Sequence, residues 1–197
     1  MTEKGDSYLF PGGMRLIFVE LPKDNGGARL VMDWFVPTGE ALVQTRHVHS
    51  GPAGAVVERF ELIAGSAECE VGGRRQRADA PHVFDVPSEA THVHPRNVGT
   101  GEMHVRQSVL PPEPDLRVTS GGLRFFETTA ALAQRGKLNR KGEIADPLQS
   151  LLTLNDTLMD PTWLPGLPRP LQRAMFAAGA GLARMLGYKA HHMPVKQ

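Results

Sequence analysis

Residues 56–78 read VVERFELIAGSAECEVGGRRQRA and divide into three short runs separated by glycines. Runs of this length, rich in Val, Ile, Leu and aromatic residues and bounded by turn-forming residues, are typical of β-strands. Gly72 and Gly73 stand between the second and third runs, and both tolerate the positive φ that a tight hairpin requires. The stretch therefore predicts three consecutive strands, the last two joined as a hairpin.

Similar runs lie on both sides of this stretch. They are Met14–Leu21, Arg29–Val36, Val83–Val86, Thr91–Pro95 and Glu102–Leu110. About eight short strands, punctuated by Gly and Pro and interrupted by no long helix, indicate a β-sandwich or a small β-barrel.

The character of the chain changes at the proline-rich residues 111–114, which cannot continue a central strand. Beyond them, apolar residues recur at helical spacing in Gly122–Gln134 and Leu171–Tyr188. A third helix is expected to begin after Asp146, because an Asp followed by Pro and then by Gln is a helix start signal. We therefore expect two parts: a β-domain at residues 1–112 and a helical extension at residues 113–197.

Composition excludes several classes of protein. The chain of 197 residues carries 22 Lys+Arg and 21 Asp+Glu, and its basic residues form no cluster interleaved with aromatics, so we expect no nucleic-acid partner. Its single cysteine, Cys69, excludes a disulfide framework and a cysteine-based zinc site. The longest apolar run, Ala174–Ala183, is too short to span a bilayer, and the N-terminus does not resemble a signal peptide. We expect a cytoplasmic protein without a membrane span.

Histidines provide the chemistry that the sequence suggests. Four of the eight lie in two pairs inside the β-region, His47-Val48-His49 and His92-Val93-His94. Residues i and i+2 of a strand project from the same face, so each pair can direct two imidazoles into one pocket. Imidazoles with a carboxylate suit Fe, Mn, Ni, Cu or Zn, without distinguishing among these divalent ions.

These residues resemble the motifs of the cupin family. His47-Val-His49 followed by Glu58, six residues and Gly65 is similar to the first cupin motif, and Pro87 followed five residues later by His92 is similar to the second. The resemblance implies a mainly β fold, the cupin-type double-stranded β-helix or jelly-roll barrel, here with a C-terminal α-helical extension. It also implies a divalent metal bound by His47, His49, Glu58 and His92.

The chain departs from the family pattern in three places. Residues 50–54 are inserted between His49 and Glu58 and must bulge as a loop before the strand resumes. Pro81 and Glu89 stand where the second motif usually has glycines. Asn97 lies one residue late after His92, so His94 is an alternative ligand to His92.

Two functions follow from the resemblance. One is a mononuclear metal-dependent enzyme, an oxygenase or isomerase acting on a small organic substrate, in which Glu58 either binds the ion or serves as the catalytic base. The other is a non-catalytic cupin that binds a small molecule at a degenerate metal site. Without a metal, Glu58 is an ordinary strand carboxylate. The helical extension is expected to pack on the barrel or to form a dimer interface, and a homodimer is expected because cupins commonly pair.

Overall fold

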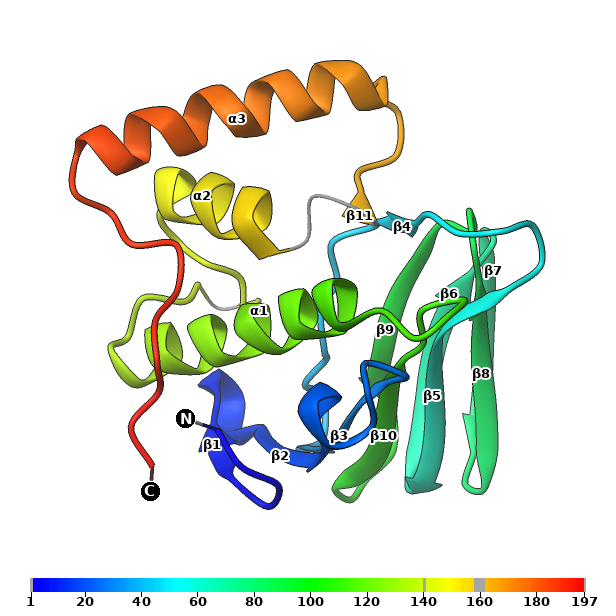
Figure 1. Ribbon diagram of the computed structural model, residues 1–197. Helices are drawn as coiled ribbons and strands as arrows, with labels where there is room; N and C mark the ends of the chain where they lie inside the picture. The colour runs from blue at the N-terminus through cyan, green and yellow to red at the C-terminus, as the bar shows by residue number, and fades with distance from the viewer. Residues whose placement is uncertain (1, 140, 158–161, 197) are drawn as a thin grey trace.

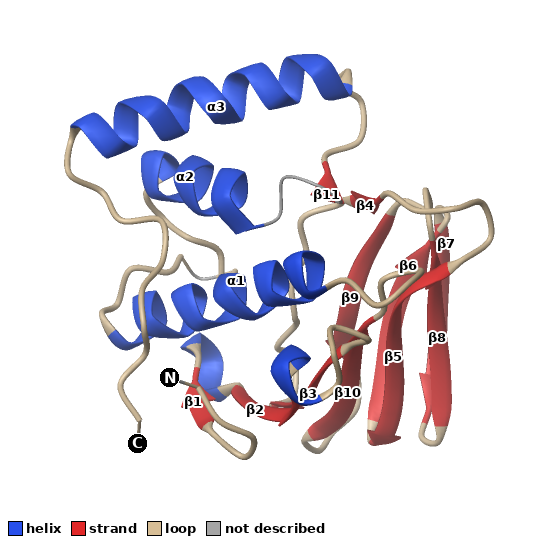
Figure 2. Ribbon diagram, viewed as in Figure 1, coloured by secondary structure: helices blue, strands red, loops and turns tan. Residues whose placement is uncertain are grey.

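The computed structural model describes residues 2–139, 141–157 and 162–196. Strands fill the first part of the chain, and the three long helices follow residue 115 (Figure 2). The strands are β1 (Ser7–Leu9), β2 (Arg15–Glu20), β3 (Leu30–Val36), β4 (Val48–His49), β5 (Val56–Ala64), β6 (Ser66–Val71), β7 (Arg74–Asp79), β8 (His82–Pro87), β9 (His92–Asn97), β10 (Met103–Val109) and β11 (Thr162–Trp163). The helices are α1 (Leu116–Gln134), α2 (Pro147–Thr157) and α3 (Arg169–Met185), with short 3-10 turns η1 (Pro11–Gly13) and η2 (Pro22–Asp24).

Two antiparallel sheets form the barrel. The larger has the order β1-β2-β3-β10-β5-β8, and the smaller has the order β7-β6-β9. Bridges between Ala41 and Arg96 and between His47 and His92 add the segment that leads into β4 to the outer side of β9. The facing sets are therefore β3-β10-β5-β8 and β4-β9-β6-β7.

The chain crosses between the sheets after β3, β4, β5, β7, β8 and β9, which is the connectivity of a jelly roll. The fold class predicted from the sequence, a mainly β cupin-type jelly roll with a helical extension, is confirmed. β4 ends at His49 and β5 begins at Val56, so the inserted residues 50–54 do form a loop, also as predicted.

Inward-facing residues of the larger sheet build the core. Phe60 of β5 lies opposite Phe84 of β8, Trp34 of β3 lies opposite Val105 of β10, and all four are buried. Phe126 of α1 belongs to the same cluster, so this helix seals part of the barrel. Burying such a side chain contributes about 1.5–3 kcal/mol to folding.

Helix α1 begins six residues earlier than the predicted Gly122. The Asp115 side chain caps it by accepting hydrogen bonds from the amides of Arg117 and Val118, and the helix continues through Gly121 and Gly122. A Cβ on Gly121 would lie 2.3 Å from the carbonyl oxygen of Thr157 in α2, so this glycine permits close helix contact rather than ending the helix. Prolines before the helix and a glycine pair inside it are both unfavourable to helices, so the sequence pattern predicted a later first residue for α1.

The three helices stack beside the barrel, with α1 nearest to the strands, α2 next and α3 outermost (Figure 1). After α2 the chain returns to the barrel, where β11 pairs with β4 in the register Thr162–His49 and Trp163–Val48. The indole of Trp163 donates a 2.8 Å hydrogen bond to the Ser50 hydroxyl. Within the described ranges, no helix is both long and apolar enough to cross a membrane.

Candidate metal centre

Strand pairing brings the two histidine pairs together. The amide of His47 donates to the carbonyl of His92 at 3.2 Å, and the amide of His92 donates back at 3.0 Å. Their rings lie 4.1 Å apart between centroids. His92 and His94 project from the same face of β9, with nearly parallel rings, as the i, i+2 spacing predicted.

Glu58 reaches this cluster from β5 in the opposite sheet. The pairing of β5 with β8 shifts register between Val56 and Glu58, immediately after the inserted loop. The Glu58 side chain is buried, and its Oε2 lies 3.0 Å from Nε2 of His92, 3.4 Å from Nε2 of His94 and 3.5 Å from Nε2 of His49. One carboxylate oxygen thus faces three imidazoles.

The other oxygen of Glu58 is held by a buried relay. The Gln107 amide donates a 2.6 Å hydrogen bond to Glu58 Oε1, and the Trp34 indole donates a 2.8 Å hydrogen bond to Gln107 Oε1. Trp34, Gln107 and Glu58 are all buried. The relay fixes which oxygen turns toward the histidines.

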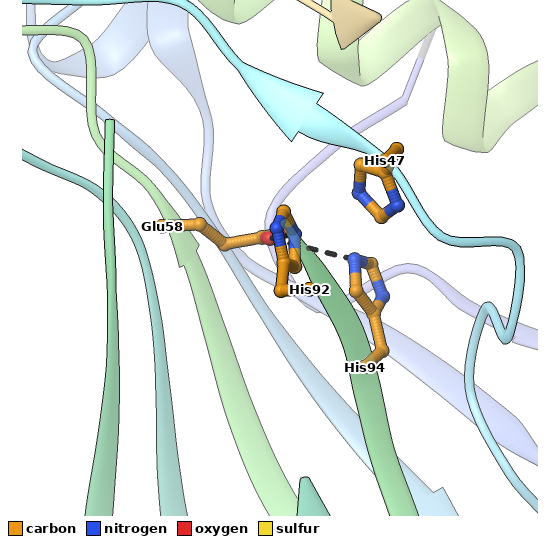
Figure 3. A group of neighbouring side chains, drawn as sticks. All are labelled: His47, Glu58, His92 and His94. Carbon is orange, nitrogen blue, oxygen red and sulfur yellow. Dashed lines mark hydrogen bonds and ion pairs between the residues drawn. The ribbon is translucent and has the colours of Figure 1, made fainter. Parts of the chain in front are cut away.

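Four residues form a compact group of donor atoms. His47, Glu58, His92 and His94 are buried, and each offers one ligand atom within 4.8 Å of the others. Figure 3 shows the three rings gathered around the carboxylate. His49 lies outside this group, although it contacts Glu58. The group therefore contains three of the four ligands implied by the resemblance, His47, Glu58 and His92, together with His94 in place of His49.

Backbone carbonyls fix the tautomers of two rings. Nδ1 of His47 lies 2.8 Å from the carbonyl oxygen of Thr45, and Nδ1 of His92 lies 3.1 Å from that of Ala90. A carbonyl only accepts, so each Nδ1 must carry the proton, and in the neutral ring Nε2 then carries a lone pair. This arrangement is typical of histidines that bind a metal through Nε2.

The Nε2 lone pairs of these rings face the Glu58 carboxylate, whose oxygens can only accept hydrogen bonds. Nε2 of His94 is buried and has no hydrogen-bond partner among the described residues. A cation among these atoms would satisfy the lone pairs of the rings and the charge of Glu58 together, whereas protein contacts alone leave them opposed. The donor set therefore fits a divalent metal ion.

Burial and mutual charge set the ionisation of the cluster. Burial lowers the pKa of His47 well below its ordinary value, and the neighbouring His94, His92 and His49 lower it further. Burial likewise lowers the pKa of His94, against the raising effect of Glu58. Burial alone would raise the pKa of Glu58, but the neighbouring imidazoles, His94 foremost, hold that pKa well below its usual range. Neutral imidazoles around an ionised carboxylate are the form that binds a metal.

A cavity of about 390 Å³ adjoins the cluster, and His47, His49, Glu58 and His94 form part of its wall. Most of the remaining wall is apolar. It comes from the barrel, from α1 and α2, and from residues 141–144, 162 and 164. The helical extension therefore shapes the space in front of the donor atoms.

Some site residues were not predicted from the sequence. Gln107 carries no motif, and only its inward register in β10 points to the site. Thr162, whose hydroxyl lies 3.0 Å from Nδ1 of His49, is distant from His49 in sequence and follows the segment after α2. Two other histidines of the barrel lie outside the site: His82 is exposed on β8, and Nε2 of His104 lies 3.3 Å from Oδ2 of Asp33.

Comparisons with known proteins found resemblances among solved structures. No protein-family model matches the sequence, and no curated protein matches it. Similar solved structures include KdgF from Halomonas, with 15% identity and a TM-score of 0.42 over 57% of this chain and 94% of that chain. A Cupin 2 conserved barrel domain protein from Salinispora arenicola has 13% identity and a TM-score of 0.40 over 53% of this chain and 82% of that chain.

An acetylacetone dioxygenase from Acinetobacter johnsonii has 19% identity and a TM-score of 0.39 over 56% of this chain and 71% of that chain. With TM-scores below 0.5, these likenesses carry no conclusion about this chain. The strand order of the two sheets carries the assignment of the fold as a cupin-type jelly roll.

Proposed function

We propose that the protein binds one divalent transition-metal ion through His47, Glu58, His92 and His94 and acts as an oxygenase on a small organic substrate. One observation carries the proposal. Imidazole nitrogens, two of them with tautomers fixed by backbone carbonyls, converge on one oxygen of a buried carboxylate.

The types of donor atom restrict the choice of metal ion. Three imidazoles and one carboxylate suit Fe, Mn, Ni, Cu or Zn better than the oxygen-preferring ions Ca and Mg. Four residues of this chain would hold the ion, and the adjoining cavity would admit the substrate and oxygen. Bound there, a redox-active ion such as Fe(II) supplies activation of O₂, and dioxygenation places both oxygen atoms in the organic product without a further co-substrate.

The chain's own residues prepare the site for this chemistry. Glu58 is assigned to the ion rather than to proton abstraction, because Gln107 holds one of its oxygens and the histidines surround the other. His49 lines the cavity, and Thr162 orients its ring. The apolar wall keeps bulk water away from the open side of the donor cluster.

A second function is favoured by His49. Its Nε2 lies as close to Glu58 Oε2 as that of His94 does, within 0.1 Å (3.5 Å against 3.4 Å). If His49 also held the ion, the protein itself would supply five ligands, which would suit a non-catalytic protein that binds one small ligand. Oxygen consumption by the iron-loaded protein with enolic and phenolic compounds separates the two: turnover supports the oxygenase, and stoichiometric binding without oxygen uptake supports the binder.

Elemental analysis tests the metal site itself. We expect near-stoichiometric metal in untagged protein, as purified or after reconstitution with each of the five ions, and loss of that metal in His47→Ala/His92→Ala. His82→Ala is the matched control, because this histidine is exposed on β8 and should leave the metal content unchanged. Full metal content in the double variant, or no metal after reconstitution, would overturn the proposal.

Single variants decide which histidines bind. The motif assigns His49 to the ion, whereas the geometry favours His94, which belongs to the compact donor group. We expect His94→Ala to lower metal affinity at least tenfold more than His49→Ala in a competition with a chromogenic chelator. The reverse order would restore the ligand set His47, His49, Glu58 and His92.

A further inference from the structure

We infer that the helical extension makes the cavity a binding site for a mainly apolar, ring-containing molecule with a single polar head directed at the histidine cluster. The inference deepens the proposed function and rests on it for the direction of that head. Three observations carry it: the aromatic wall, the volume and the face that α1 turns to the cavity.

Aromatic side chains line the cavity in a continuous series. Phe10 and Trp34 meet edge to face at 5.1 Å between ring centroids, Trp34 and Phe126 meet at 6.0 Å, and Phe126 and Phe125 meet at 5.4 Å. All four residues contribute to the wall. Flat ligand rings gain from offset or edge-to-face contacts with such a wall, beyond the gain from burying apolar area, whereas flexible chains do not.

The volume sets the size of the molecule. An apolar cavity of about 150 Å³ holds one benzene ring. The cavity here, about 390 Å³, is about two and a half times larger and falls in the ordinary range for small-molecule sites. It therefore accommodates about 10–15 non-hydrogen atoms, the size of a two-ring compound.

Helix α1 presents one face to this space. Val118, Gly122, Phe125, Phe126 and Thr129 all line the cavity, and their spacing of three, four, seven and eight residues is that of one helical face. Gly122 leaves room in this face, since a Cβ added there reaches only ordinary contact with Leu30, at 3.5 Å. The part of the chain outside the barrel thus determines what fits.

The polar end of the cavity is distinct from this wall. His49, Glu58 and His94 line it, and the unpartnered Nε2 of the buried His94 belongs to it. A hydroxyl or enol head placed there can interact with these groups or with an ion that they hold. A ligand with one polar end and an apolar ring body therefore matches both parts of the wall.

Calorimetric titration of the metal-free full-length protein with 2-naphthol and 1-decanol tests the inference. The two probes share the number of carbon atoms and a single hydroxyl head but differ in shape. We expect 2-naphthol to bind at least tenfold more tightly than 1-decanol, with a negative heat-capacity change from apolar burial. Equal affinity for the two alcohols, or no detectable binding of 2-naphthol, would overturn it.

Variants of α1 locate the bound ring. Gly122→Leu should weaken 2-naphthol binding at least tenfold, whereas Gly181→Leu should not, because an added Cβ at Gly181 in α3 meets open space. Val118→Phe fills the cavity from the same face and serves if Gly122→Leu lacks the circular dichroism spectrum of the folded protein. Wild-type affinity in a folded Gly122→Leu or Val118→Phe variant would place the ligand elsewhere and contradict the inference.

A negative result in this titration would contradict the inference without contradicting the proposed function. The titration uses metal-free protein, whereas the metal site is judged by elemental analysis. Naphthol binding in a protein that never takes up metal removes the proposed oxygenase and leaves the ring site standing. Full metal loading in a protein that does not bind 2-naphthol would support the metal site and overturn the ring-binding site.

Discussion

The two oxygens of Glu58 have different neighbours, and Gln107 determines which one faces the histidines. Among the described residues, the side chain of Gln107 hydrogen-bonds to Glu58 and Trp34 and to no other member of the donor group. Partners that orient a ligand in this way typically change metal affinity by 10–100-fold when removed.

Replacement of Gln107 tests this positioning role. We expect Gln107→Ala to weaken metal binding by roughly 10–100-fold while the barrel stays folded. Competition with a chromogenic chelator measures the affinity, and Gln76→Ala on the exposed strand β7 is the matched glutamine control. Unchanged affinity in Gln107→Ala would show that Glu58 needs no orienting partner.

Glu89 occupies a backbone conformation that suits glycine. Its φ is +65°, and it stands where the cupin motif usually has a glycine. The left-handed conformation costs a non-glycine residue about 1–2 kcal/mol. The Glu89 side chain forms an ion pair with Arg169 at the start of α3, but both partners are substantially exposed, so the pair contributes little.

The order of stability of Glu89 variants follows from these costs. Glu89→Gly relieves the strain but adds about 0.5–1 kcal/mol of chain entropy to be lost on folding, so we expect a net gain of about 0.5 kcal/mol. Glu89→Ala keeps the strain and loses the ion pair, and its stability should be equal to or below that of the wild type. Urea denaturation measures both, and a glycine variant less stable than the alanine variant would contradict this account.

At the scale of elements, Gly121 and Gly122 are neighbours in α1 with opposite surroundings. A Cβ on Gly121 would meet the Thr157 carbonyl oxygen at 2.3 Å, whereas a Cβ on Gly122 would be 3.5 Å from Leu30. Overpacking of this kind typically costs about 1–3 kcal/mol. We expect Gly121→Ala to lower the free energy of unfolding by about that amount and Gly122→Ala to lower it by less than 0.5 kcal/mol or to raise it, since alanine favours a helix. Equal effects of the two substitutions on the urea midpoint would show that α2 yields at this contact.

The elements that could be predicted from the sequence are those whose signals are local. The strands on both sides of Gly72 and Gly73 were predicted from a hairpin signal. The glycine of the first motif, Gly65, is explained by its own backbone conformation. Gly65 has a φ of +88°, and a Cβ there would lie 3.0 Å from Cα of Met103.

The elements that could not be predicted depend on distant partners. β11 is two residues long and is a strand only because β4 lies beside it. Helix α1 runs through two glycines because α2 crosses it closely. In the site, the motifs placed His47, His49, Glu58 and His92 near one another, but the position of Gln107 behind Glu58 and of α1 over the cavity depends on tertiary packing.

At the scale of the whole molecule, the helices are attached to the barrel in two different ways. Helix α1 shares the barrel core through Phe126 and Ala130, whereas Ala180 and Ala183 of α3 pack with Leu152 of α2 in a separate cluster. Further contacts join the C-terminal segment to α1, including a 2.8 Å contact between His191 and Glu127.

Deletion of residues 165–197 should therefore expose the apolar face of α2 and release this segment from α1. We expect an aggregating or unfolded protein, detected by size-exclusion chromatography and by circular dichroism. A soluble truncated protein with the thermal midpoint of the full chain would show that α3 contributes nothing to the stability of the barrel.

The same chromatography of the full chain, with light scattering, tests the predicted homodimer.

The pairing of β11 with β4 has a consequence for the order in which the site is completed during synthesis. The four donor residues and His49 lie between positions 47 and 94, and Gln107, which holds Glu58, follows soon after. Thr162, which orients His49, and Leu164, which closes part of the cavity wall, emerge from the ribosome more than fifty residues later. The residues of the donor cluster are therefore synthesised before the segments that close the cavity over them.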